Sequence, residues 1–114
     1  MAMTPALFVL TERGRETAER VREILGDCTV VAGQAARQEE TNAGRFGDEM
    51  RAAFAAGRPI VGICATGVIV RLLAPALANK QSEPPVVAVS EDGSAVVPVL
   101  GVAHAIRQIL DGHW

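Results

Sequence analysis

Five short apolar runs recur along the chain, each rich in Val, Ile, Leu and Ala. Apolar residues stand at consecutive positions in these runs rather than at alternate ones, which is typical of strands that are buried on both faces. The runs therefore predict five β-strands, at residues 6–10, 29–32, 60–63, 86–89 and 95–99.

The segments between the runs show helical spacing instead. In residues 11–25 the apolar side chains fall on one face and Arg and Glu side chains on the other, and Gly26 ends the pattern. A second periodic segment ends before Gly57 and Pro59. We expect helices at 11–25, from about Phe46 to Phe54, at 66–77 and at 102–110, with a long polar loop at 33–44.

The alternation of strands and helices predicts one α/β domain over residues 1–114: a three-layer α/β/α, flavodoxin-like fold with a mostly parallel five-stranded sheet. The first three strands should be parallel, with strand 60–63 internal. The Asp92-Gly93 turn allows an antiparallel pairing of the last two strands at an edge. Ligands in such folds bind beyond the carboxyl ends of the strands. The candidate ligand-binding loops are therefore those after Leu10, Ala32, Ile63 and Val99.

Composition narrows the function classes. The net charge of −2 and the lack of Tyr disfavour a nucleic-acid partner, which needs clustered cations and stacking rings. No apolar run is long enough for a membrane span, and no leading signal segment is seen, so we expect a cytoplasmic protein. Cys28 and Cys64 are far apart and outside any metal-binding pattern, and no metal or other cofactor is expected.

Residues 64–71, CATGVIVR, pair a cysteine with an arginine in a way that resembles a phosphatase loop. Such a loop needs five intervening residues, most of them small, so that backbone N–H groups surround a phosphate. Six residues intervene here, and three of them are bulky and apolar. A thiol phosphatase is therefore disfavoured, and Cys64 is interpreted as a small core residue.

Thr66 and Gly67 follow the third strand where a helix should begin. Thr66 has the side chain of a helix cap, and Gly67 would let a ligand approach the backbone N–H groups, an arrangement that suits an anion. An ordinary tight turn explains the same residues equally well.

Arg71 stands inside the most apolar segment of the chain. A guanidinium in an apolar helix is costly unless it reaches water, a carboxylate or carbonyl oxygens. Arg71 could extend to the helix end, pair with Glu12 or bind a ligand carboxylate. Residue type alone slightly favours a structural ion pair.

The segment PIVGICATGVIVRLLAPALANK, residues 59–80, and the strand and Glu-x-Gly turn that follow it resemble a known family. The resemblance is to the N-terminal domain of CbiG, a cobalamin-biosynthesis protein also described as cobalt-precorrin-5A hydrolase. The matching positions are Gly67, Val70, Arg71, Ala74, Pro75, Leu77, Lys80, Pro85, Val86, Val87, Glu91, Gly93, Pro98 and Leu100.

The resemblance implies hydrolytic opening of a lactone on a corrinoid precursor, with release of a two-carbon fragment. The substrate would carry acetate and propionate groups, for which Arg71 and Lys80 become carboxylate anchors beside Thr66-Gly67 and Thr11. Glu12 is then the candidate general base, because it follows the first strand at the same edge. The alternatives are a corrinoid-binding or docking module fused to a precorrin methyltransferase, and a flavodoxin-like binder unrelated to corrinoids.

One departure from the family concerns the end of the last strand. The family carries a Gly-His-x-Gly-Gly-Ala-Asn segment there, whereas Gly101 is followed here by Val102-Ala103-His104. A single glycine is also a short joint between a strand and a helix. Either the loop has been deleted, or the chain as given omits it.

Overall fold

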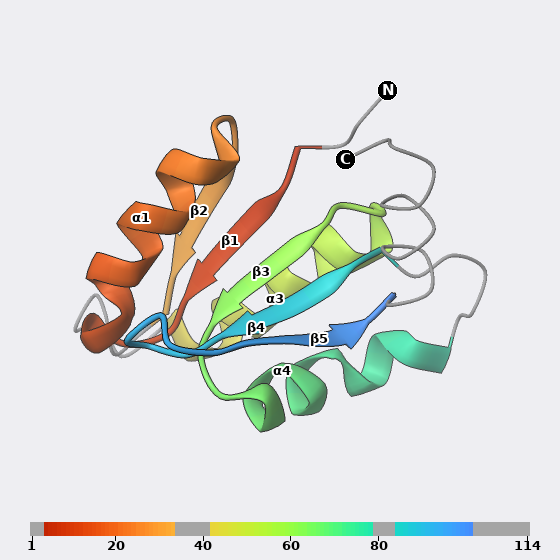
Figure 1. Cartoon of the computed structure of the whole chain (residues 1–114). Helices are drawn as coiled ribbons and strands as arrows, with labels where there is room; N and C mark the ends of the chain where they lie inside the picture. The colour runs from red at the N-terminus through yellow and green to blue at the C-terminus, as the bar shows by residue number, and fades with distance from the viewer. Residues whose placement is uncertain (1–3, 34–41, 79–83, 102–114) are drawn as a thin grey trace.

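The computed structural model describes residues 4–33, 42–78 and 84–101 and contains a five-stranded sheet (Figure 1). The expected final helix at 102–110, the Gly101–Val102 joint and Lys80 lie outside the described residues. The elements in chain order are β1 (Ala6–Val9), η1 (Glu12–Gly14), α1 (Arg15–Leu25), β2 (Thr29–Ala32), α3 (Asn42–Ala55), β3 (Ile60–Ile63), α4 (Thr66–Leu73), η2 (Ala74–Ala78), β4 (Val86–Val89) and β5 (Val96–Leu100).

The strand order is β2-β1-β3-β4-β5, and β1 to β4 are parallel. This confirms the mostly parallel, flavodoxin-like sheet, with β3 internal and largely buried. β5 pairs antiparallel with β4 at the edge. This agrees with the antiparallel pairing that the Asp92-Gly93 turn allows. The loop after Val99 therefore leaves the sheet at the opposite end from the loops after β1, β2 and β3, so it is not at the carboxyl ends of the parallel strands, where ligands were expected.

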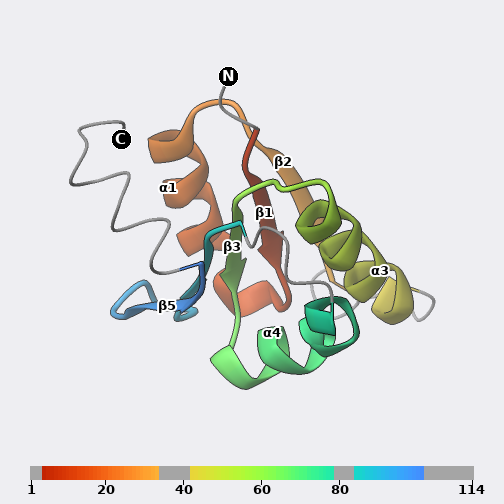
Figure 2. The same cartoon turned by 90° about the vertical axis from the view of Figure 1, so that its right-hand side faces the viewer.

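The sheet divides the core into two parts, because neighbouring residues of a strand point to opposite faces. On one face Phe8 and Ile60 pack with Phe46 of α3 and Ile69 of α4. On the other, a smaller cluster joins Leu7, Val9, Ile63 and Val89 to Ala18 of α1. Figure 2 shows α1 on one side of the sheet and α3 and α4 on the other, which confirms the three layers.

Three helices differ from the sequence expectation at their ends. The first begins as the 3-10 turn η1 at Glu12, and the α-helix starts only at Arg15. The second, expected from about Phe46, already begins at Asn42, within the segment 33–44 that was expected to be a loop. The third ends as an α-helix at Leu73 and continues as η2, because Pro75 has no N–H to donate and its ring opposes an α-helical turn. Among the described residues, no helix has both the length and the apolar character needed to cross a bilayer.

Candidate functional site

The carboxyl ends of β1, β3 and β4 bring three chain segments to one edge of the sheet. Val9, Ile63 and Val89 are aligned across these parallel strands, so the residues that follow them emerge side by side. Figure 1 shows the start of α1, the start of α4 and the β4–β5 turn at this same end. We define the carboxyl rim as Thr11, Glu12, Thr66, Gly67 and Glu91.

Thr11 and Glu91 connect the outer two of these segments. The Thr11 hydroxyl donates a hydrogen bond to Glu91 Oε2, and both residues are half-buried. The pair links the end of β1 to the end of β4, with the end of β3 between them. Thr11 also precedes η1 in the N-cap position, but its side chain makes no capping hydrogen bond there.

Helix α1 fixes the backbone of Glu91. The buried Thr17 hydroxyl donates to the Glu91 carbonyl at 2.5 Å. Arg20 Nη2 in turn donates to Thr17 Oγ1 at 3.3 Å and to the Asp92 carbonyl at 3.5 Å. Glu91 is thus held through its side chain by the loop after β1 and through its main chain by α1.

The β4–β5 turn is closed by one carboxylate oxygen. Asp92 Oδ1 accepts hydrogen bonds from the Ser94 hydroxyl at 2.7 Å, the Ser94 N–H at 2.9 Å and the Ser90 hydroxyl at 2.9 Å. The Ser94 hydroxyl, followed by the Ser94 N–H and the Ser90 hydroxyl, lowers the pKa of Asp92 to about 2. Gly93 has a φ of +78°, which favours glycine. Asp92 therefore stabilises the turn, and Glu91 faces the rim.

Glu12 lies on the open side of the rim. Its Oε2 accepts a hydrogen bond from Arg15 Nε at 3.1 Å, and about two-thirds of the side chain (66%) is exposed. An ion pair this exposed contributes little to stability. The structure does not support the Glu12–Arg71 pair considered from the sequence, since Glu12 interacts with Arg15 on its own helical turn.

Thr66 and Gly67 are the first two residues of α4. The cap position is Ala65 and carries no side-chain hydrogen bond, so the expectation that Thr66 caps the helix is wrong. Val68 N–H and Ile69 N–H return to the Ala65 carbonyl, whereas the N–H groups of Thr66 and Gly67 have no recorded acceptor within the described segments. A Cβ placed on Gly67 would meet no atom within 4 Å. The backbone here is open to a ligand.

Arg71 lies on the solvent-exposed face of α4, with Gly67 and Val70. Ile69 and Leu73 occupy the buried face and are fully covered. This amphipathic arrangement explains an arginine within an apolar segment, because the cation points to water while its neighbours enter the core. No hydrogen bond or ion pair joins Arg71 to another residue in 4–33, 42–78 or 84–101, so the structural ion pair favoured from the sequence is absent there.

Cys64 is 4% exposed and packs in the α3–α4 side of the core. Burial, and secondarily the charge of Glu91, raises the pKa of its thiol to about 11. The thiol is therefore protonated at neutral pH and is a poor nucleophile. This confirms the interpretation of Cys64 as a core residue. In the part of the chain that the structure describes, no three His, Cys, Asp or Glu side chains are grouped as a metal site.

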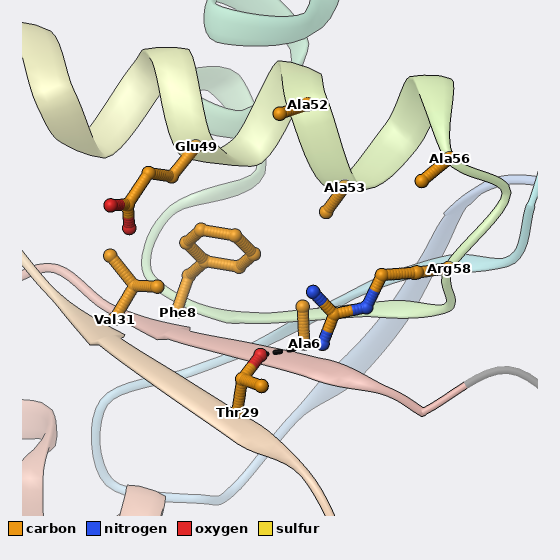
Figure 3. A pocket seen from close by; sticks show the side chains of 9 residues that line it. All are labelled: Ala6, Phe8, Thr29, Val31, Glu49, Ala52, Ala53, Ala56 and Arg58. Carbon is orange, nitrogen blue, oxygen red and sulfur yellow. Dashed lines mark hydrogen bonds between the residues drawn. The ribbon is translucent and has the colours of Figure 1, made fainter.

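A cavity of about 310 Å³ lies away from the carboxyl rim, between α3 and strands β1 and β2 (Figure 3). Ala52 and Ala53 of α3, Ala56 just after it, and the side chains of Phe8 and Val31 line the cavity. Arg58 Nη2 donates to Thr29 Oγ1 at 2.6 Å at one end. No rim residue lines it, and the sequence analysis did not anticipate it.

Glu91 is the rim residue that sequence reasoning missed as part of the site. The sequence indicates Glu91 only as part of a Glu-x-Gly turn and of the family resemblance, and the loop after β4 is not among the four loops expected to bind a ligand. The available signal was its position: Glu91 follows the apolar β4 two residues after the strand ends, much as Thr11 follows β1. The structure brings Thr11, Glu12, Thr66, Gly67 and Glu91 to one edge.

Comparison with known proteins agrees with the resemblance carried by the residues. The family model described as "Cobalamin synthesis G N-terminal" matches residues 48–107, which include Thr66, Gly67, Arg71 and Glu91. The chain is 35% identical over 113 residues to the cobalt-precorrin-5A hydrolase of Salmonella typhimurium, covering 94% of this chain and 32% of that protein. No solved structure matches the chain. Because the family model covers more than half of its residues, the chain belongs to the cobalamin synthesis G N-terminal family.

Proposed function

We propose that this domain takes part in cobalamin biosynthesis by opening a lactone on a corrinoid precursor with water, in a reaction that releases a two-carbon fragment. The observation that carries the proposal is the convergence of open N–H groups and a carboxylate at the carboxyl rim, with an arginine one turn along α4 that has no partner among the described residues. Membership of the cobalamin synthesis family and similarity to a cobalt-precorrin-5A hydrolase support it.

Substrate anchoring is assigned to α4 and the segment after it. Arg71 has an exposed guanidinium, and Val70 beside it is 46% exposed, so this helix face offers a cation next to an apolar surface. That combination suits a flat macrocycle with carboxylate groups at its margin. Lys80 is proposed as a second anchor; it lies outside the described residues.

The chemical step needs a base for water and stabilisation of the charge that forms on the lactone carbonyl oxygen. We assign the base to Glu12, which takes a proton as the water oxygen bonds to the carbonyl carbon. The N–H groups of Thr66 and Gly67 would stabilise the oxyanion. The ring C–O bond then breaks, and the proton held by Glu12 passes to the departing alkoxide, giving an alcohol and a carboxylic acid, which loses its remaining proton to water. The two-carbon fragment leaves in a later step, when the carbon–carbon bond that joins it to the macrocycle breaks.

The chain spans about a third (32%) of the length of the Salmonella relative. Further parts of a longer protein would therefore contribute to the substrate site, and the fused precorrin methyltransferase considered from the sequence remains a prediction. If this domain only docks the corrinoid, it will bind the substrate without opening it. Turnover by this chain alone and by a chain of the relative's length distinguishes the two functions.

The test of the site is Arg71→Met, titrated with the lactone-containing corrinoid intermediate. A charge-assisted contact contributes roughly 1.5–3 kcal/mol, so we expect binding to weaken about 10- to 150-fold. The control is Arg45→Met, which removes another exposed helical arginine, on α3. If folded Arg71→Met binds as tightly as the parent and the control, the assignment of the anchor is wrong.

A further inference from the structure

The Thr11–Glu91 pair determines which hydrogen-bonding groups Thr11 offers to the rim. A hydroxyl has one proton to donate and two lone pairs to accept with, whereas an ionised carboxylate only accepts. Since Thr11 Oγ1 donates to Glu91 Oε2, its single proton is already used. A ligand that meets Thr11 therefore finds a hydrogen-bond acceptor.

Within the described parts of the chain, no donor makes a hydrogen bond to the lone pairs of the Thr11 hydroxyl. A threonine that precedes a helix commonly accepts a hydrogen bond from an N–H of the first turn. Thr11 has an extended backbone in this position, yet no capping bond reaches its side chain. The Gly14 N–H closes η1 on the Thr11 carbonyl instead, at 3.1 Å.

The position of Glu91 is set before any ligand binds. Its carbonyl oxygen is held by the buried Thr17, and the following residue is held by Arg20 and by its own turn. Because the main chain of Glu91 and one of its carboxylate oxygens are both held, the O–H of Thr11 stays directed at that oxygen. Polar groups that are already oriented can stabilise a transition state without the energetic cost of reorienting during the reaction.

We propose that Glu91 is a positioning residue that makes Thr11 the acceptor for the attacking water, leaving Glu12, the next residue in the chain, to take the water's other proton. This inference rests on the proposed function and refines it. A substrate carboxylate has no proton to give Thr11, so Thr11 binds water, while a substrate carboxylate goes to Arg71 and the oxyanion to the open N–H groups of Thr66 and Gly67.

The test measures kcat and KM for lactone opening in the full chain. Thr11→Val removes the acceptor and should lower kcat about tenfold with little change in KM. Thr11→Ser restores an oxygen and should recover most of the loss. Glu91→Met should also lower kcat, and adding it to Thr11→Val should cause no further loss, because Glu91 acts through Thr11.

Thr29→Val is the matched control, since it removes a hydroxyl that accepts from Arg58 at the far end of the sheet. A rise in KM with unchanged kcat in Thr11→Val would overturn the inference, because Thr11 would then bind substrate directly. Multiplicative losses of kcat in the double variant would also overturn it. If the parent itself does not open the lactone, the proposed function fails and the inference fails with it; an active parent with equally active variants defeats the inference alone.

Discussion

The two ends of the parallel sheet are both joined by polar side chains, but they use them differently. At the amino end, Arg58 donates to the Thr4 carbonyl at 2.8 Å, the Pro5 carbonyl at 3.3 Å and the Thr29 hydroxyl at 2.6 Å. These bonds hold the entry of β1 to the start of β2. Arg58 thus uses its Nε and Nη2 groups to join two strands.

At the carboxyl end, the corresponding groups keep hydrogen-bonding capacity that the described protein does not use. Thr11 retains its lone pairs, Thr66 and Gly67 retain their N–H groups, and Arg71 has no partner among the described residues. Polar groups that serve only to stabilise a fold normally have hydrogen-bond partners within the protein. A cluster of polar groups without such partners therefore indicates a ligand-binding site. We therefore expect substitutions at the amino end to change stability and those at the rim to change function.

The largest expected effect concerns Glu12. Glu12→Gln keeps the shape of the side chain but cannot accept a proton, so kcat for lactone opening should fall about 10²- to 10⁴-fold. Thermal stability should change little, because the Glu12–Arg15 pair is exposed. Glu49→Gln on α3 is the control for the same substitution away from the rim. Parent-like turnover by Glu12→Gln would remove Glu12 from the mechanism.

Arg58→Met tests the opposite end. Losing three hydrogen bonds of about 0.5–1.5 kcal/mol each should lower the free energy of unfolding by about 1.5–4.5 kcal/mol, measured by urea denaturation. Corrinoid binding by the remaining folded protein should be unchanged. If corrinoid binding weakens in proportion to the loss of stability, the two ends of the sheet are coupled. The distinction between a structural amino end and a functional carboxyl end would then be wrong.

Gly14, which lies next to the carboxyl rim, and Gly67, which belongs to it, allow the effect of core packing to be separated from the effect of ligand access. A Cβ on Gly14 would lie 2.7 Å from Ile63 Cγ2, so Gly14→Ala should destabilise the domain by about 1–3 kcal/mol. Gly67→Ala meets open space and should leave the melting temperature unchanged or slightly raised, while it obstructs ligand approach to the N–H groups. Equal melting temperatures for the two variants would contradict the packing of Gly14 on β3.

The Cys64 thiol should give a smaller, pH-dependent effect. Its pKa is about 11 in the folded protein, above that of an unfolded thiol, so the folded state disfavours the thiolate. Stability should therefore fall as pH rises from about 9 towards 11, and Cys64→Ala should lack this decline. Alkylation at pH 8 should modify Cys28, which is half-buried, well before Cys64. Rapid native alkylation of Cys64 would argue against its burial.

The smallest expected effect is at Asp92, which is fully exposed. Its pKa is lowered to about 2 in the fold, so the charged form contributes stability above the unfolded pKa of about 4 and loses this contribution as pH falls towards 2. Asp92→Asn should melt slightly below the parent at pH 6, and the two should converge near pH 2. A constant difference between the melting curves across this range would exclude the charge as the cause.

The fold was largely predictable, because the five strands are short apolar runs and the helices between them have clear periodicity. Pattern alone could not assign the direction of β5, since an antiparallel edge strand has the same composition as a parallel one. The site was partly predictable from strand ends, which identified Thr11, Glu12, Thr66 and Gly67. The partner of Thr11 was not, because a contact across the sheet depends on strand order, which local sequence does not encode.

The bond between Thr11 and Glu91 joins residues 80 positions apart, and the Thr17–Glu91 bond spans 74. Contacts of such long range close large loops and tend to form late, after the local helices and the first strand pairs. A chain still emerging from the ribosome would therefore contain Thr11, Glu12 and α4 before it contained the carboxylate that orients them. In this order of events, the rim is assembled only when β4 has docked beside β3.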